Sequence, residues 1–245
     1  MTAQQGAGER AGLLRLELET LWVLDREGRI VRSTSPDVPY EPLLVVAAHP
    51  GAPVWAASAQ VPATLMDGLA AAVADAAPID DVGWQPSTAA EILAILRTAG
   101  LGALAPAMGG PSWRIPATMR RRRTGAELCT SHDLALDALQ GRMPEQDRRL
   151  TEPWVVAMVA GEVAAVCETA RSTAHGVEAG VWTYEPHRRQ GLAVAVTAAW
   201  SELVTDRTAF YSTSWDNDAS QAVARRLDLE PLGHWWQVFR REPVG

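Results

Sequence analysis

Residues 188–193 read Arg-Arg-Gln-Gly-Leu-Ala and lie between a strand-like and a helix-like segment. The first turn of a helix has backbone N–H groups without helical partners, and the helix dipole makes that end attractive to an anion. Two arginines add positive charge at the same place. Gly191 allows a backbone conformation or a close approach that a side chain would prevent. The segment therefore predicts a turn that binds a phosphate group.

The elements around this turn predict an α/β domain with mixed strand pairing. A hairpin is expected at 154–170, because two apolar runs flank a tight Ala-Gly-Glu turn. The other predicted strands are 176–183, 208–214 and 232–239, and the predicted helices are 131–140, 190–205 and 218–227.

The first part of the chain is less regular. Two strands are predicted within 20–33, with further strands at 43–48 and 54–57 and helices at 62–77 and 87–97. Glycine and proline then cluster between about 100 and 111, which indicates a boundary. The chain is thus expected to have an N-terminal α/β extension, residues 1–110, and a second domain, residues 111–245.

Composition restricts the function classes. The chain has 245 residues, 47% of them apolar, enough for a sizeable core. No apolar run approaches the roughly 18 residues of a membrane span, and no signal peptide is visible, so a cytoplasmic protein without membrane contact is expected. The two cysteines form no disulfide framework or metal cluster, so no metal is expected.

Charge is distributed unevenly along the chain, whose net charge is −7. Residues 1–110 hold 6 arginines against 12 acidic residues, a net charge of −6. This argues against nucleic acid as a partner. It favours a cationic small molecule, although an acidic surface that only keeps the protein soluble explains it equally well.

Two motifs resemble those of the GNAT N-acetyltransferase superfamily. Arg188-x-x-Gly191-x-Ala193 after a strand resembles its acyl-CoA pyrophosphate loop. About 25 residues later, Asn217 and Ser220 have the Asn-x-x-Ser spacing of the family's second signature, a strand followed by a helix. The resemblance covers about residues 115–245. It implies a GNAT-like mixed central sheet flanked by helices, with residues 1–110 as an extension or a degenerate second lobe.

The resemblance also implies a reaction and a cofactor site. An acetyl group would pass from acetyl-CoA to a primary amine of a small molecule or peptide, by direct attack and without a metal. The cofactor would lie in an opening between strands 178–183 and 208–214. The implied cofactor-binding residues are Val181, Thr183, Arg188, Arg189, Gln190, Gly191, Leu192, Ala193, Asn217 and Ser220.

The groups that would move protons are less clear from the sequence. The family often has a tyrosine seven residues after the signature Asn, but this chain has Ala224 there. Ser220 could donate a proton to the leaving sulfur, or it could be a plain cofactor contact. Glu178 is the first choice for the base, since a carboxylate near an apolar cleft can have a raised pKa; an ion-pairing carboxylate is the alternative. Weaker candidates are Glu168, Tyr184, His187 and Asp216.

Two tryptophans, Trp182 and Trp215, are close in sequence to the predicted opening and could line an acceptor pocket, although core packing is the usual role of tryptophan. The identity of the acceptor and a longer acyl group stay open. The main alternative function is a non-catalytic acyl-CoA-binding sensor or regulatory module; a structural protein that uses the fold without a cofactor is a third. Residues 233–239 could form a sheet edge in a homodimer.

Overall fold

The structure is a computed structural model that describes residues 3–36, 38, 40–48, 53–76, 85–117, 119, 124–139, 141–143 and 149–241. The chain forms two compact units. The first consists of Met1–Ser112, Ser212–Asp218 and Pro231–Gly245, and the second of Trp113–Tyr211 and Ala219–Glu230. The chain first passes from one unit to the other between Ser112 and Trp113, close to the boundary expected near residue 110. The last strand, however, belongs to the first unit, because it pairs with a strand of residues 44–48.

The first unit begins with helix α1 (Ala3–Leu21), which the sequence did not predict. The hairpin of β1 (Trp22–Leu24) and β2 (Ile30–Ser33) follows. Asp25 closes its turn, since one carboxylate oxygen accepts the N–H groups of Glu27 (3.0 Å) and Arg29 (2.8 Å).

The sheet of this unit has the strand order β4-β3-β11-β5. The strands are β3 (Leu44–Ala48), β4 (Val54–Ala57), β5 (Met108–Ile115) and β11 (Glu230–Val238). The helical segments η1 (Ala63–Leu65), α2 (Met66–Ala74) and α3 (Ala89–Arg97) provide apolar residues to the same core as β3 and β11. Because β11 lies between β3 and β5, it is an inner strand and not the sheet edge considered for a dimer contact.

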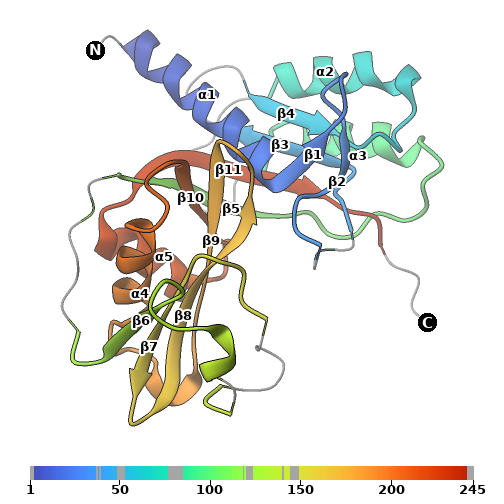
Figure 1. The fold of residues 1–245 in the computed structure, drawn as a ribbon. Helices are drawn as coiled ribbons and strands as arrows, with labels where there is room; N and C mark the ends of the chain where they lie inside the picture. Colours follow the sequence, from blue (N-terminus) through green and yellow to red (C-terminus); the bar gives the residue numbers. More distant parts are fainter. Residues whose placement is uncertain are drawn as a thin grey trace. The chain divides into compact units, whose positions relative to one another are not determined.

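The second unit contains the mixed sheet predicted for this part of the chain, with the strand order β5-β10-β9-β8-β7-β6 (Figure 1). Residues 113–115 of β5 belong to this unit. Pairing is antiparallel from β6 to β9 and parallel between β9 and β10. The strands are β6 (Glu127–Thr130), β7 (Trp154–Val159), β8 (Glu162–Ser172), β9 (Gly176–Thr183) and β10 (Thr208–Ser212). The helical segments are η2 (Leu136–Leu139), η4 (Glu185–His187), α4 (Leu192–Ser201) and α5 (Asp218–Leu227).

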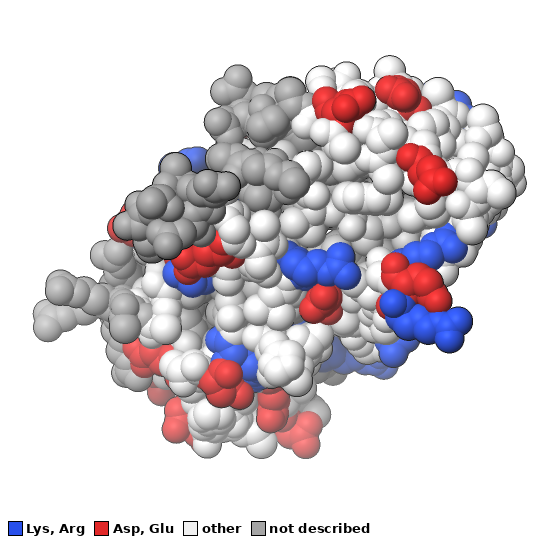
Figure 2. Space-filling view, turned by 90° about the horizontal axis from the view of Figure 1, so that it is seen from above, with Lys and Arg blue, Asp and Glu red and all other residues white. Residues whose placement is uncertain are grey.

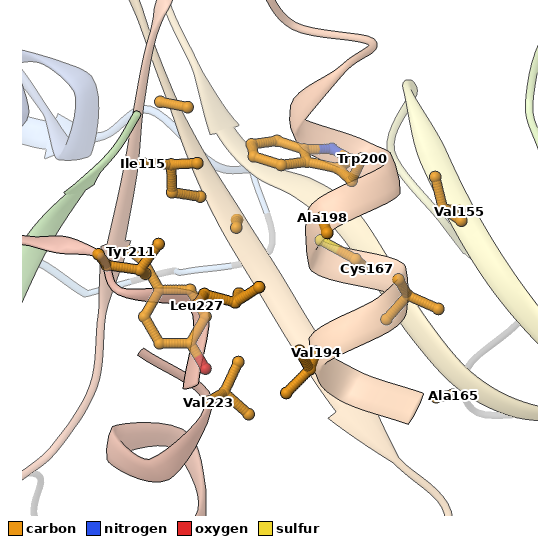
Figure 3. Packing of buried hydrophobic residues seen from close by; sticks show 14 of the residues in the cluster. Ile115, Val155, Ala165, Cys167, Val194, Ala198, Trp200, Tyr211, Val223 and Leu227 are labelled. Carbon is orange, nitrogen blue, oxygen red and sulfur yellow. The ribbon is translucent and has the colours of Figure 1, made fainter. Parts of the chain in front are cut away.

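Apolar clusters cover both faces of this sheet, because successive strand residues point to opposite sides. One cluster joins β8 and β9 to α4 and α5, with Cys167, Val194, Trp200 and Tyr211 among its members (Figure 3). The other contains Trp154 and Val166, with Leu139 from η2. The helices α4 and α5 thus belong to one face of the sheet, and the residues of the second cluster lie on the opposite face.

Acidic and basic side chains are intermixed on the face of the molecule shown in Figure 2. On this face, charges of opposite sign therefore lie near one another.

Candidate functional site

The parallel strands β9 and β10 pair over only three positions. Gly176–Glu178 pair with Thr208–Phe210, and the pairing ends there although both strands are described to their last residues. On its other edge, β9 stays paired with β8 as far as Thr183. Among the described residues, no strand therefore pairs with this edge of β9 from Ala179 onward, and the resemblance implied an opening between these strands.

The backbone groups of β9 that face this opening follow from the strand alternation. Thr208 donates its N–H to the carbonyl of His175 (2.9 Å), so the backbone groups of His175 point toward β10. Residues at even spacing from His175 direct their N–H and C=O groups the same way. Val181 and Thr183 are at even spacing from His175, so their backbone groups also point toward the β10 side. Both residues lie beyond Glu178, the last residue of β9 that pairs with β10. They therefore present donors and acceptors that an extended ligand with amide groups could bind as an added strand.

The turn after β9 has an unusual backbone. Arg189 has a φ of +63° and Gly191 a φ of +78°, both in the left-handed region. The φ of Gly191 explains why glycine occupies this position, because a left-handed backbone costs other residues roughly 1–2 kcal/mol. Arg188 donates from Nε to the carbonyl of Thr183 (3.3 Å), and Gln190 from Nε2 to that of Pro186 (3.5 Å).

Helix α4 begins directly after this turn without a side-chain cap. Gly191 is its N-cap residue and makes no side-chain capping hydrogen bond. The first helical bond runs from the N–H of Ala195 to the carbonyl of Gly191. The N–H groups of residues 192–194 precede that bond, so they have no acceptor within the helix. An anion could accept from them, as the sequence predicted.

Positive charge surrounds the turn. The side chains of Arg188 and Arg189 are exposed. A third arginine, Arg226 at the end of α5, places Nη2 3.6 Å from the position that a Cβ on Gly191 would occupy. No local signal in the sequence connects Arg226 to this turn, because the two are 35 positions apart. The fold of the second unit thus adds a cation that the sequence reasoning missed.

The two residues of the second signature fall in different units. Asn217 belongs to the first unit, where its N–H donates to the carbonyl of Ser214 (3.2 Å). Ser220 lies in the second unit, and its carbonyl accepts a hydrogen bond from the hydroxyl of Tyr211 (3.4 Å). Burial raises the pKa of Tyr211 to about 12, although the bond to Ser220 opposes the shift. Ala224, in place of the family's tyrosine, is buried in the same core.

Glu178 lies at the last paired position of β9 and forms an ion pair. One of its oxygens is 2.5 Å from Nη1 of Arg171, and the side chains are 6% and 20% exposed. The structure thus shows the ion-pairing carboxylate that the sequence left as the alternative, and the role of Glu178 as a base stays a prediction. Glu168, a weaker candidate, lies opposite Gly180 on the neighbouring strand and accepts the N–H of Thr151 (2.6 Å).

The two tryptophans considered for an acceptor pocket also fall in different units. Trp182 is half-buried and packs against the second-unit cluster that contains Trp154. Trp215 packs against the apolar core of the first unit and stacks on His234, with ring centroids 4.9 Å apart. Only Trp182 therefore shares a unit with the turn and the opening.

A cavity of about 410 Å³ lies elsewhere in the second unit. It is lined by residues beyond the C-terminal end of α4, among them Leu203 and Arg207, and by Glu152 and His132. Helix α4 has ten residues and is therefore about 15 Å long. The length of that helix separates the cavity from the turn before Leu192, so the cavity is not part of the cofactor site described above.

The described residues contain neither a metal-ligand cluster nor a membrane-spanning helix. No group of three or more His, Cys, Asp and Glu side chains in this part of the chain could hold a metal ion. No helix in the described ranges is long and apolar enough to cross a membrane.

Comparison with known proteins gives one family match. Residues 155–236 match the family model of the GNAT acetyltransferases. This range contains β8, β9, the turn, both helices and most of β11. No curated protein matches the chain.

Solved structures with similar folds are distant in sequence. A putative GNAT-family acetyltransferase from Novosphingobium aromaticivorans is 10% identical (58% of this chain, 68% of that one, TM-score 0.44). A GCN5-related N-acetyltransferase from Kribbella flavida is 20% identical (62% and 64%, TM-score 0.43). A tandem GNAT protein from the clavulanic acid biosynthesis pathway is 14% identical (70% and 63%, TM-score 0.45). The chain therefore spans about two thirds of the length of these proteins.

Proposed function

We propose that this chain, whose residues 155–236 match the family model of the GNAT acetyltransferases, transfers an acetyl group from acetyl-CoA to a primary amine. The observation that carries the proposal is the end of the β9–β10 pairing after Glu178 and Phe210, combined with the uncapped start of α4 nearby in the chain. The first feature offers backbone groups beyond the paired segment to a chain of amides, and the second offers N–H groups to a phosphate.

The residues present suit the chemical groups of acetyl-CoA. The pantetheine arm contains two amides, which match the outward-facing backbone groups of Val181 and Thr183. The pyrophosphate matches the N–H groups at the start of α4 and the positive charge of Arg188, Arg189 and Arg226. Contacts of Gln190, Leu192, Ala193 and Ser220 with the cofactor are part of the same proposal.

Direct attack of the amine on the thioester is the step that fits these residues. A covalent acyl-enzyme needs an activated nucleophile. Burial raises the pKa of the Cys167 thiol well above its usual value, and desolvation with nearby Glu127 and Asp133 raises that of Cys129. Both thiols are therefore poor nucleophiles at neutral pH. Holding the amine and the thioester in line would supply much of the rate, and the N–H of Val181 could stabilise the oxyanion.

A non-catalytic acyl-CoA-binding module is the second candidate. Two observations favour it: Ala224 replaces the family's tyrosine, and Glu178 is held in an ion pair. Such a module would bind acetyl-CoA at the same backbone groups but would not release CoA when an amine is added.

The test begins with calorimetric titration of acetyl-CoA, with NAD as the control ligand. Gly191→Trp should raise the Kd at least about 100-fold, a loss of about 2.8 kcal/mol, because the indole would crowd the N–H groups that bind the phosphate. Gly141→Trp is the matched control, since Gly141 has the same φ of +78° in the same unit and its side-chain position is open. Unchanged binding by Gly191→Trp would contradict the placement of the pyrophosphate.

The second step measures CoA release from acetyl-CoA with a panel of amines: a polyamine, an amino-acid ester, an aminoglycoside and an amine-bearing peptide. Turnover with any of them supports the transferase. Saturable binding of acetyl-CoA without turnover would favour the binding module instead.

A further inference from the structure

Helices α4 and α5 cover one face of the sheet, so we place the approach of the amine on the opposite face. Ala179 and Val181 belong to the cluster that packs with these two helices. Side chains alternate along a strand, so Glu178, Gly180 and Trp182 lie on the opposite face, and Trp182 does pack against the other cluster. A group that takes a proton from the amine is therefore expected on the face of Gly180.

One row of residues crosses the sheet at the level where the opening begins. Trp154 of β7 pairs with Glu168 of β8, and Glu168 pairs with Gly180 of β9. Gly180 lies two residues beyond Glu178, the last residue of β9 that pairs with β10. The three residues share a face, and Glu168 is the only one of them with a titratable side chain.

Glu168 has a neighbour on each adjoining strand, Trp154 on β7 and Gly180 on β9. On one side stands the indole of Trp154, which is fully buried. On the other side Gly180 has no side chain, and a Cβ there would lie 3.4 Å from Cγ of Glu168 and 3.0 Å from Cβ of Ala170. The stem of Glu168 thus occupies the space that Gly180 leaves. The N–H of Thr151 donates to Oε2 (2.6 Å) and holds the carboxylate in place.

The other carboxylate of this face is held by a cation. Glu178 is 2.5 Å from the Arg171 guanidinium, and its side chain is 6% exposed. Among the described residues, the charged groups on the strands and the segment around Glu168 are this pair, Glu162 at the start of β8, and Arg149 and Glu152 on the segment that includes Thr151.

We propose that Glu168 is the base that deprotonates the acceptor amine, an inference that rests on the proposed acetyl transfer. The ammonium gives one proton to the Glu168 carboxylate, directly or through a water molecule. The nitrogen lone pair then forms the N–C bond, the C–S bond breaks, and CoA leaves as a thiolate. The second proton of the nitrogen neutralises the thiolate, and Glu168 returns its proton to solvent, so atoms and charge balance.

The test compares Glu168→Gln with wild type in the CoA-release assay, with the most active alkylamine of the panel and with hydroxylamine. Hydroxylamine is already neutral at pH 7 and needs no base. For the alkylamine at pH 7, Glu168→Gln should lower kcat/KM by about 100-fold or more, and the loss should shrink as the pH rises toward the pKa of the amine, because the free amine needs no base. For hydroxylamine, the rate should stay within a few fold of wild type. Gln can still accept the Thr151 N–H, and an unchanged acetyl-CoA titration would show that the site is intact.

Glu162→Gln is the comparison variant, because Glu162 is an exposed carboxylate at the start of the same strand, and it should keep kcat/KM with the alkylamine. An equal loss of kcat/KM by Glu168→Gln with the alkylamine and with hydroxylamine, or an equal loss by Glu162→Gln, would overturn the assignment while leaving acetyl transfer standing. A wild-type protein that releases no CoA with any amine or with hydroxylamine would overturn the transferase itself, and the role of Glu168 with it.

Discussion

The ion pair of Arg171 and Glu178 leads to a prediction about stability. Removing one partner of a buried pair typically costs 3–5 kcal/mol, because the other charge stays buried without compensation. Arg171 is 20% exposed, so Glu178→Gln should cost about 3 kcal/mol, at the low end of that range. The matched control is Glu230→Gln, since Glu230 is also 2.5 Å from an arginine, Arg114, but these side chains are 47% and 32% exposed. Exposed pairs contribute about 0.2–1 kcal/mol.

Thermal unfolding would measure the difference. A loss of 1 kcal/mol lowers Tm by roughly 2–4 °C in a chain of this size. Glu178→Gln should then lower Tm by roughly 6–12 °C, and Glu230→Gln by at most about 4 °C. The double variant Arg171→Leu/Glu178→Leu should recover much of the loss, because it leaves no buried charge. If Glu178→Gln cost no more than Glu230→Gln, Arg171 would not hold Glu178 in solution, and Glu178 would again be the stronger candidate for the base.

Two further predictions concern the second unit. Gly191→Ala and Gly141→Ala should each lower the free energy of unfolding by roughly 1–2 kcal/mol, because both sites have a φ of +78°. Neither new Cβ would approach another atom closer than 3.6 Å, so no steric cost is added. Thermal unfolding measures both losses, and a much larger loss for Gly191→Ala would mean that its Cβ meets a closer neighbour. The raised pKa of Tyr211, about 12, predicts an alkaline effect. The unfolded chain loses this proton from about pH 10, while the folded protein keeps it, so stability should fall as the pH rises from about 10 toward 12. Urea unfolding at pH 9 and pH 11 should show a smaller fall for Tyr211→Phe than for wild type, and equal falls would refute the shift.

Helix α1 shows why part of the first unit could not be predicted. Its sequence contains Gly6, Gly8 and Gly12, and each glycine in a helix interior costs about 1 kcal/mol relative to alanine. Its stability comes instead from packing, since Leu14 and Leu18 are fully buried. Such burial depends on partners far away in the chain, and a local pattern cannot report it.

The start of α3 is a smaller example, because Ser87 or Thr88 with Glu91 close behind indicates a capping box. Thr88 is the N-cap residue but makes no side-chain capping bond. Its hydroxyl donates instead to the carbonyl of Ala72 (2.6 Å), which lies in α2. A tertiary contact thus replaced the local bond that the spacing indicated.

The sequence by itself determined the turn at residues 188–193 and the elements on either side of it. A left-handed glycine, an uncapped helix start and two arginines are properties of neighbouring residues, so they can be read along the chain. The mixed sheet of the second unit was likewise predicted from the order of its elements, and the structure confirms it.

Only the tertiary structure decided which distant side chains meet at this site. Strand register brings Glu168 beside Gly180 and pairs Glu178 with Arg171, and helix packing brings Arg226 to Gly191. Register also ends the β9–β10 pairing after Glu178. A shift of one residue would turn every side chain of a strand to the other face. The sequence therefore indicated where a cofactor could bind, while the fold determined which carboxylate lies beside Gly180.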